Sequence, residues 1–191
     1  MRKPGLAFVV IVFLLPVAAT AQEYPKVEVF GGYSYFQANP GAVNLHGWNA
    51  SVAGNITGWF GIVGDVSGHY GSPKEFGFTV PYADINSYTF MGGPKLAARI
   101  GAVTPFAHFL IGAARAGTAA FGFSVSDTAL AAAVGGGVDI KVSSWLAIRA
   151  AQADYLMTRY QTHPDNHYRS YDERQNNFRF SAGVVFLFGN R

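Results

Sequence analysis

Hydrophobic and polar residues alternate with a period of two along most of the chain after residue 22, and this alternation predicts β-strands rather than helices. The pattern is clearest near the C-terminus, where Phe178, Phe180, Phe186 and Phe188 share one face of a segment and Arg179 lies on the other. Eight such segments lie at 26–37, 45–57, 60–71, 84–97, 104–115, 128–141, 145–157 and 177–189. Each has at least the ~9 to 11 residues that a tilted strand needs to cross a membrane.

The two faces of these segments differ in a way that favours a membrane barrel over a soluble sandwich. A soluble sandwich turns its apolar faces inward, and its outward faces are usually charged. Here only 13% of residues are charged, and the polar faces carry mainly Gly, Ser, Ala and Asn. Such faces suit a narrow lumen, and closure of the sheet satisfies every backbone group in lipid. The sequence therefore predicts an all-β fold, an eight-stranded antiparallel up-and-down transmembrane β-barrel.

The seventh segment departs from strict alternation. Arg149 and Gln152 are three positions apart, and strict alternation places only residues at even spacing on the same face. Arg149 can therefore share the inner face with Gln152 and Asp154 only if the strand contains one extra, unpaired residue between them. We predict a β-bulge near Ala150 and Ala151. The alternative is that Gln152 and Asp154 lie at the rim of the barrel, where the direction of a side chain matters less.

The lengths of the connections also alternate, as they do in outer-membrane barrels with short periplasmic turns and longer extracellular loops. The connections at 58–59, 98–103 and 142–144 are short, whereas those after the first, third, fifth and seventh segments are longer. The longest, 158–176, is strongly polar. This arrangement predicts that both chain ends lie in the periplasm and that the longer connections face outward.

The first 21 residues have the pattern of a cleaved signal peptide. Arg2 and Lys3 precede an apolar run at 6–15, and the small-residue end Ala19-Thr20-Ala21 predicts cleavage before Gln22. The alternative, a transmembrane helix, needs ~20 apolar residues, which this run does not supply. We expect a signal peptide at 1–21 and one barrel domain at 22–191.

Composition and charge exclude several classes of function. The formal charge of +3 falls to +1 when Arg2 and Lys3 are removed, which gives no electrostatic footprint for nucleic acid. The absence of cysteine excludes disulfides, thiol catalysis and cysteine-based zinc sites. We expect no cofactor.

Charged residues on the inner faces form the main candidate site. Because an unpaired charge in a low-dielectric interior costs several kcal/mol, we expect these residues to form ion pairs, although the sequence does not give the pairs. The inward charged candidates are Glu28, Asp65, Lys95, His108, Asp139, Arg149, Asp154 and Arg179.

Aromatic residues near the segment ends suggest two interfacial belts, which membrane proteins place at the two lipid–water boundaries. Trp59 and Trp145 lie at the ends predicted to be periplasmic. The candidates for the opposite belt are Tyr33, Tyr35, Tyr70, Tyr88 and Tyr155.

The final segment, SAGVVFLF at 181–188, resembles the signal that the barrel-assembly machinery reads. The matching residues are Ser181, Gly183, Phe186 and Phe188, and the match departs from the usual pattern because three residues, 189–191, follow the last phenylalanine. More broadly, VEVFGGYSY at 27–35, GGGVDIKV at 135–142 and IRAAQADY at 148–155 resemble the OmpA-like outer-membrane β-barrel family.

The family resemblance covers the barrel alone, without the peptidoglycan-binding domain of larger members. It implies a Gram-negative outer-membrane protein that meets lipid and lipopolysaccharide and whose lumen is filled by side chains. It also implies a non-enzymatic structural or surface-interaction role through extracellular loops.

Several alternatives remain open. A small passive pore would need a gap among the interior charges. A lipid A-modifying hydrolase would need a serine or histidine with an acidic partner, and Ser67 beside His69 is the nearest arrangement, whereas His46 has no such neighbours. A soluble lipocalin-like carrier would turn its apolar face inward. The pattern His163-x-Asp165-x-His167 does not supply converging ligands, so we expect no metal site.

Overall fold

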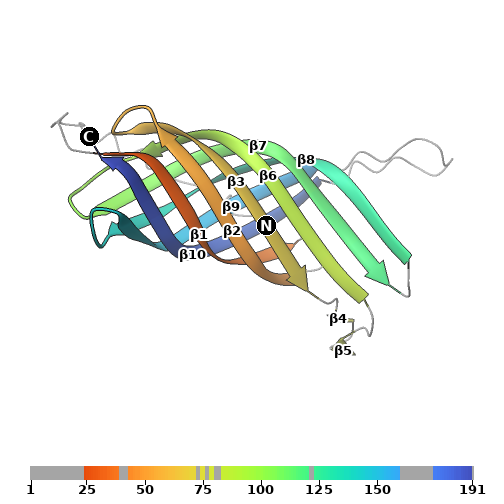
Figure 1. The fold of residues 1–191 in the computed structure, drawn as a ribbon. Coiled ribbons are helices and arrows are strands. Elements are labelled where there is room, and N and C mark those ends of the chain that lie inside the picture. The colour runs from red at the N-terminus through yellow and green to blue at the C-terminus, as the bar shows by residue number, and fades with distance from the viewer. Residues whose placement is uncertain are drawn as a thin grey trace, which may run out of the picture.

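The protein forms a closed antiparallel β-barrel in a computed structural model (Figure 1). The structure describes residues 24–38, 43–71, 74–75, 78–79, 83–120, 123–159 and 174–190, and the expected signal peptide at 1–21 lies outside this part of the chain. The barrel strands are β1 (Pro25–Ala38), β2 (Val43–Asn55), β3 (Phe60–Gly71), β6 (Ala83–Ala97), β7 (Val103–Ala120), β8 (Phe123–Lys141), β9 (Leu146–Arg159) and β10 (Arg174–Asn190). Each pairs with the next along the chain, and β10 closes on β1. Among the described residues, no helix is long and apolar enough to cross a membrane.

The eight-stranded fold predicted from alternation is confirmed, with differences in strand length. The sequence predicts a long connection at 116–127, but β7 and β8 continue their pairing to Ala120 and Phe123 and leave two residues between them. Two strands already in register can continue their ladder wherever a two-residue connection joins them. A second addition is a short pair, β4 (Lys74–Glu75) with β5 (Phe78–Thr79), between β3 and β6.

The alternation of connection lengths is confirmed only in part, because the connections at 72–82 and 160–173 are long but those at 39–42 and 121–122 are as short as the turns at the other end. At the end that we call the turn end, tight connections at 56–59, 98–102 and 142–145 join the strands, and β1 begins and β10 ends there. Backbone hydrogen bonds such as Ile100 N–H to Val103 O close these turns, and Gly101 has a φ of 61°, a value that glycine adopts without strain. We call the opposite end, towards which β7 and β8 extend, the loop end (Figure 1).

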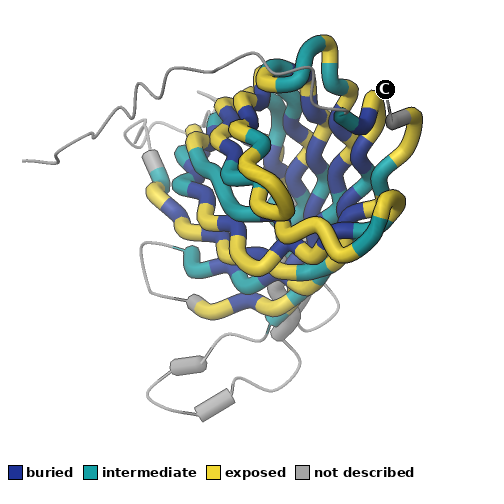
Figure 2. Tube along the Cα trace, turned by 90° about the vertical axis from the view of Figure 1, so that its left-hand side faces the viewer, coloured by how far each residue is buried: buried dark blue, intermediate teal, exposed yellow. Residues whose placement is uncertain are grey.

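Exposure alternates along the strands, so the barrel has an apolar outside and a mixed inside (Figure 2). On β10, Phe178, Phe180 and Phe186 are exposed, whereas Arg179 and Ser181 between them are buried. Such an outward row of large apolar side chains is what a lipid-facing barrel wall requires.

The predicted β-bulge in β9 is confirmed. Ala150 and Ala151 are exposed in succession, and the register of β9 with β8 shifts so that Val138 pairs with Ala151 but Asp139 with Arg149. The extra residue returns Arg149 to the same inner face as Gln152, which is also buried. The bulge therefore allows the whole of β9 to send its polar side chains into the lumen.

Candidate functional site

The interior of the barrel contains a charged region near the turn end and in the middle. All the inward charged residues predicted from the sequence are buried there: Glu28, Asp65, Lys95, His108, Asp139, Arg149, Asp154 and Arg179. They come from seven different strands, because alternation sends every second side chain inward and the closed sheet brings these side chains towards one axis.

Glu28 on β1 forms the centre of the group nearest the turn end. Its carboxylate pairs with the ammonium of Lys95 on β6 and accepts a hydrogen bond from the Arg99 guanidinium at 2.9 Å. Asn55 on β2 donates a further hydrogen bond at 2.8 Å. Three donors thus surround one buried carboxylate, which offsets the cost of removing it from water.

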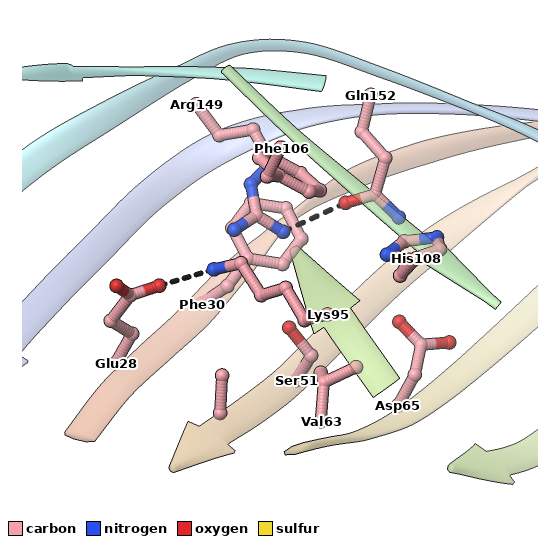
Figure 3. Close-up of a pocket in the computed structure, with 11 residues that line it drawn as sticks. Glu28, Phe30, Ser51, Val63, Asp65, Lys95, Phe106, His108, Arg149 and Gln152 are labelled. Carbon is pink, nitrogen blue, oxygen red and sulfur yellow. Dashed lines mark hydrogen bonds and ion pairs between the residues drawn. The ribbon is translucent and has the colours of Figure 1, made fainter. Parts of the chain in front are cut away.

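Arg149 on β9 lies deeper and is held by both charge and aromatic rings. Its guanidinium donates to both carboxylate oxygens of Asp139, at 2.8 and 3.0 Å. The centre of the guanidinium lies 4.2 Å from the ring centre of Phe30 and 4.3 Å from that of Phe106. The close-up shows the guanidinium beside both rings (Figure 3). A delocalised guanidinium suits this arrangement because it can stack on rings while its edge donates hydrogen bonds.

Arg179 on β10 crosses the middle of the lumen. It donates to Asp65 on β3 at 2.7 Å and to Asp154 on β9 at 2.9 Å. His108 lies 2.7 Å from the other oxygen of Asp154, and Gln152 links Asp154 to Arg149 through its amide. The two arginines and their partners therefore form one continuous hydrogen-bonded network.

The formal charges of this network balance when His108 is counted as neutral. Four carboxylates, Glu28, Asp65, Asp139 and Asp154, face four cations, Lys95, Arg99, Arg149 and Arg179, among the described interior residues. A cavity lined by Ser51, Lys95 and His108 has a volume of about 10 Å³, or room for roughly one water molecule. A second cavity of about 40 Å³ lies at the turn end, between Glu28, Arg99 and Asp139. Paired side chains occupy most of the space between these two cavities.

An apolar cluster lies in the lumen nearer the loop end. Phe36, Leu45, Leu110 and Leu156 point inward from β1, β2, β7 and β9 and form one buried cluster, together with Met91. Leu110 and Leu156 have no exposed surface. These side chains offer no hydrogen bonds to a hydrated ion, although buried His69 lies beside Phe36 and buried Asn177 is paired with Leu156.

Ser67 and His69, the nearest arrangement to a serine–histidine pair in the sequence, do not contact each other. Inside the lumen His69 lies 2.9 Å from Ser34 Oγ on β1, whereas Ser67, two residues before it on β3, pairs with Thr89. The other ring nitrogen of His69 has no hydrogen-bond partner within the described part of the chain, so no carboxylate there orients the ring. His69 is fully buried, which separates it from any lipid outside the barrel.

The aromatic residues predicted for the interfaces lie on the outer wall. Trp59 and Trp145 are exposed in turns at the turn end. At the other end the tyrosines form hydrogen-bonded pairs with neighbouring strands: Tyr33 with His46, Tyr35 with Asn44, and Tyr88 with Tyr70. Tyr155 packs edge-on against Phe178.

The residues of the proposed assembly signal lie on β10. Phe186 and Phe188 are exposed on the outer wall, and Ser181 is buried beside Ser34 at 3.0 Å. Gly183 lies opposite Gly32 at the seam between β10 and β1.

Sequence reasoning missed several residues of the network and its surroundings. Arg99 follows β6 in a region expected to be a simple turn, yet it reaches Glu28. Phe30 and Phe106 lie inside the barrel although they are large and apolar. Their positions two residues from Glu28 and His108 could have revealed this, because alternate residues share a face.

Comparisons with known proteins agree with this architecture. Residues 6–188 match the sequence profile of the outer membrane protein beta-barrel domain family. A comparison with curated proteins gave no match.

Several solved structures share the fold. The attachment invasion locus protein Ail of Yersinia pestis is 18% identical, with 85% of this chain and 99% of Ail covered and a TM-score of 0.53. Neisserial surface protein A (NspA) is 15% identical, with coverages of 85% and 96% and a TM-score of 0.60. The outer membrane protein OprG of Pseudomonas aeruginosa is 10% identical, with coverages of 87% and 97% and a TM-score of 0.53. The chain belongs to the family of outer membrane protein β-barrel domains, as its resemblance to OmpA-like barrels suggested.

Proposed function

We propose that this outer-membrane barrel is non-enzymatic and acts through surfaces at its loop end, while its lumen stays closed. The observation that carries this proposal is the filling of the lumen by a balanced ion-pair network and an apolar cluster. Eight strands enclose just enough space for side chains, so a filled interior leaves the outer wall and the connections as the surfaces for partners.

The orientation proposed from the sequence is supported by the difference between the two ends. The turn end carries three tight connections and both ends of the barrel sequence, and outer-membrane barrels place short turns in the periplasm. We therefore place both termini in the periplasm and the connections at 39–42, 72–82, 121–122 and 160–173 outside the cell.

A hydrolase finds little support in the geometry. The Ser34–His69 contact lies inside the lumen, and the imidazole lacks an acidic partner among the described residues. A general base needs access to its substrate, and an acyl chain in the membrane cannot reach a residue that the barrel wall covers. The proposed partners are instead outer-membrane lipid, lipopolysaccharide, and the assembly machinery that would read Ser181, Gly183, Phe186 and Phe188.

A loop replacement tests the surface role. Residues 161–173 include Arg169, Asp172 and Glu173 and form the most polar connection of the chain, so they would be exchanged for Gly and Ser residues of equal number. Sucrose octasulfate is a suitable probe, because a structure of Ail exists in complex with this heparin analogue. We expect the folded protein to bind the probe and the loop variant to lose most of this binding.

A turn variant provides the control. Exchange of Ser143 and Ser144 for glycine changes the opposite end and should leave binding of the probe intact. Equal binding by the loop variant and the unaltered protein would contradict a surface role of this loop, provided that both variants keep the heat-modifiable gel migration of a folded barrel.

A further inference from the structure

A band of polar aromatic residues covers the outer face of β1, β2, β3 and β6 near the loop end. We call it the aromatic wall, and its residues are Tyr33, Tyr35, His46, Trp48, Tyr70 and Tyr88. The wall is continuous across the strands, because Tyr35 pairs with His46 and His46 with Tyr70 in one row. In the adjacent row Tyr33 pairs with Trp48.

The hydroxyl of Tyr70 is arranged to donate outward. It accepts a hydrogen bond from the Tyr88 hydroxyl at 3.1 Å and another from the indole of Trp48. A phenol oxygen has two lone pairs and one proton, so these two contacts occupy its acceptor positions and leave its own O–H as a donor. Tyr70 is 45% exposed, which makes this donor accessible.

Two further contacts on the wall have the same effect. Tyr33 Oη and Nδ1 of His46 form a hydrogen bond, and whichever of the two donates, one proton stays free, on Nε2 of His46 or on the Tyr33 hydroxyl. The Tyr35 hydroxyl donates to Asn44 Oδ1 at 2.8 Å, which leaves the Asn44 amide hydrogens as donors. Tyr70, the Tyr33–His46 pair and Asn44 thus present hydrogen-bond donors on an exposed aromatic surface, and the six wall residues include no carboxylate.

The aromatic residues of this half of the barrel are interrupted on β7 and β8. The outward positions there carry Ala113, Arg115, Leu130 and Ala132, whereas β9 and β10 carry Tyr155 and Phe178, which pack edge-on against each other. Aromatic residues that serve only as interfacial anchors form girdles around a barrel. An interrupted girdle whose polar aromatic residues gather on β1, β2, β3 and β6 with oriented donors fits a specific partner.

We propose that the aromatic wall binds the acidic sugars of a lipid-linked saccharide, the chemistry that lipopolysaccharide presents in the outer leaflet. Donors suit phosphate and carboxylate oxygens, and exposed rings suit the apolar faces of sugars. The outer surface of the same strands continues towards the turn end with exposed Val52, Ile62 and Phe90, which suit acyl chains. This continuity favours a membrane-anchored saccharide over a free one, and the inference rests on the proposed outward orientation of the loop end.

A single-tryptophan protein makes the site observable. Exchange of Trp59 and Trp145 for phenylalanine leaves Trp48, a wall residue, as the fluorescent reporter of the folded protein in detergent micelles. Lipopolysaccharide with its inner core would be titrated in parallel with phosphatidylglycerol, which has charge and acyl chains but no sugar, and with sucrose octasulfate, which has no acyl chains.

We expect a saturable change in Trp48 fluorescence with lipopolysaccharide at concentrations where phosphatidylglycerol has little effect. Sucrose octasulfate that binds the connection after β9 should leave Trp48 fluorescence unchanged, because that connection does not include the wall. Tyr70→Phe, made in the same background, should weaken this binding about tenfold, because it removes one donor and keeps the ring. Tyr155→Phe removes the same hydroxyl on β9, away from the wall, and should leave binding unchanged.

An equal response to phosphatidylglycerol would overturn the proposal in favour of a general anionic-lipid surface, and an equal response to sucrose octasulfate would overturn it in favour of a free-glycan site. Equal effects of Tyr70→Phe and Tyr155→Phe would also overturn it. The micelle measurement does not depend on orientation. A failure of the proposed orientation, detected by labelling of cells, is therefore distinguishable from a failure of the saccharide site.

Discussion

Arg149 and Asp139 face each other across β9 and β8, directly beside the point where β9 gains an extra residue. The guanidinium of Arg149 binds both carboxylate oxygens, at 2.8 and 3.0 Å. Without the bulge at Ala150 and Ala151, strict alternation would turn either Arg149 or Gln152 towards lipid. The bulge and the ion pair are therefore two parts of one arrangement.

Loss of one partner of this pair should strongly destabilise the barrel. Arg149→Leu leaves Asp139 buried without its counter-ion, which we expect to lower the free energy of unfolding by about 3 to 5 kcal/mol. The double variant Arg149→Leu with Asp139→Leu should recover part of this loss. Urea unfolding in lipid vesicles measures both, and Lys141→Leu, an exposed position on β8, serves as the control. A single variant as stable as the double variant would contradict the buried-pair account.

Deletion of Ala151 should be tolerated. The deletion leaves one residue between Arg149 and Gln152, so strict alternation keeps both side chains inside the barrel without a bulge. We expect the heat-modifiable gel band to be kept. Deletion of both Ala150 and Ala151 makes Arg149 and Gln152 adjacent, so one of the two must face lipid, where an arginine costs about 2 to 4 kcal/mol at the bilayer midplane. We expect the double deletion to lose the band, and equal folding of the two variants would contradict this account of the bulge.

The seam between β1 and β10 should tolerate no side chain at Gly183. A Cβ atom there would lie 2.3 Å from the Gly31 carbonyl oxygen, so we expect Gly183→Ala to cost about 1 to 3 kcal/mol through backbone displacement. Gly64 faces open space, and Gly64→Ala should leave stability unchanged or raise it by up to about 1 kcal/mol. Equal unfolding midpoints for the two variants would show that the seam adjusts freely.

The parts of the structure that follow from local alternation could be predicted from the sequence. Period-two patterns placed Arg179 inside and Phe180 outside, and a break in the pattern located the bulge at Ala150 and Ala151. These features depend on the direction of each side chain relative to its neighbours in the same strand.

The features that depend on contacts between distant strands could not be predicted. Glu28 receives Arg99 from a connection 71 positions away, and Arg179 meets Asp65 across 114 positions. The alternation in a single sequence shows that these side chains point inward. It does not show how far each strand is shifted along its neighbour, and this shift determines which side chains lie at the same level of the lumen. The extension of β7 and β8 was missed for a different reason, because local composition carries little information about how far a paired ladder continues.

Labelling of cells should show the proposed orientation. The chain has no cysteine, so Asn166→Cys in the connection after β9 and Ala102→Cys in a tight turn can each be labelled cleanly. We expect a membrane-impermeant maleimide to label Asn166→Cys in intact cells and Ala102→Cys after the outer membrane is permeabilised. The reverse pattern would place the termini outside.

Ion conduction through the purified protein in planar lipid bilayers tests the central claim, a closed lumen, most directly. The account predicts no long-lived conducting steps, because the balanced charges around Arg149 and Arg179 and the apolar cluster at Leu110 and Leu156 fill the interior. It also predicts that Leu110→Ala combined with Leu156→Ala raises the frequency of brief openings, since it removes the buried side chains that close the lumen. Stable conducting steps from the unaltered protein would contradict the account and make a passive pore its function.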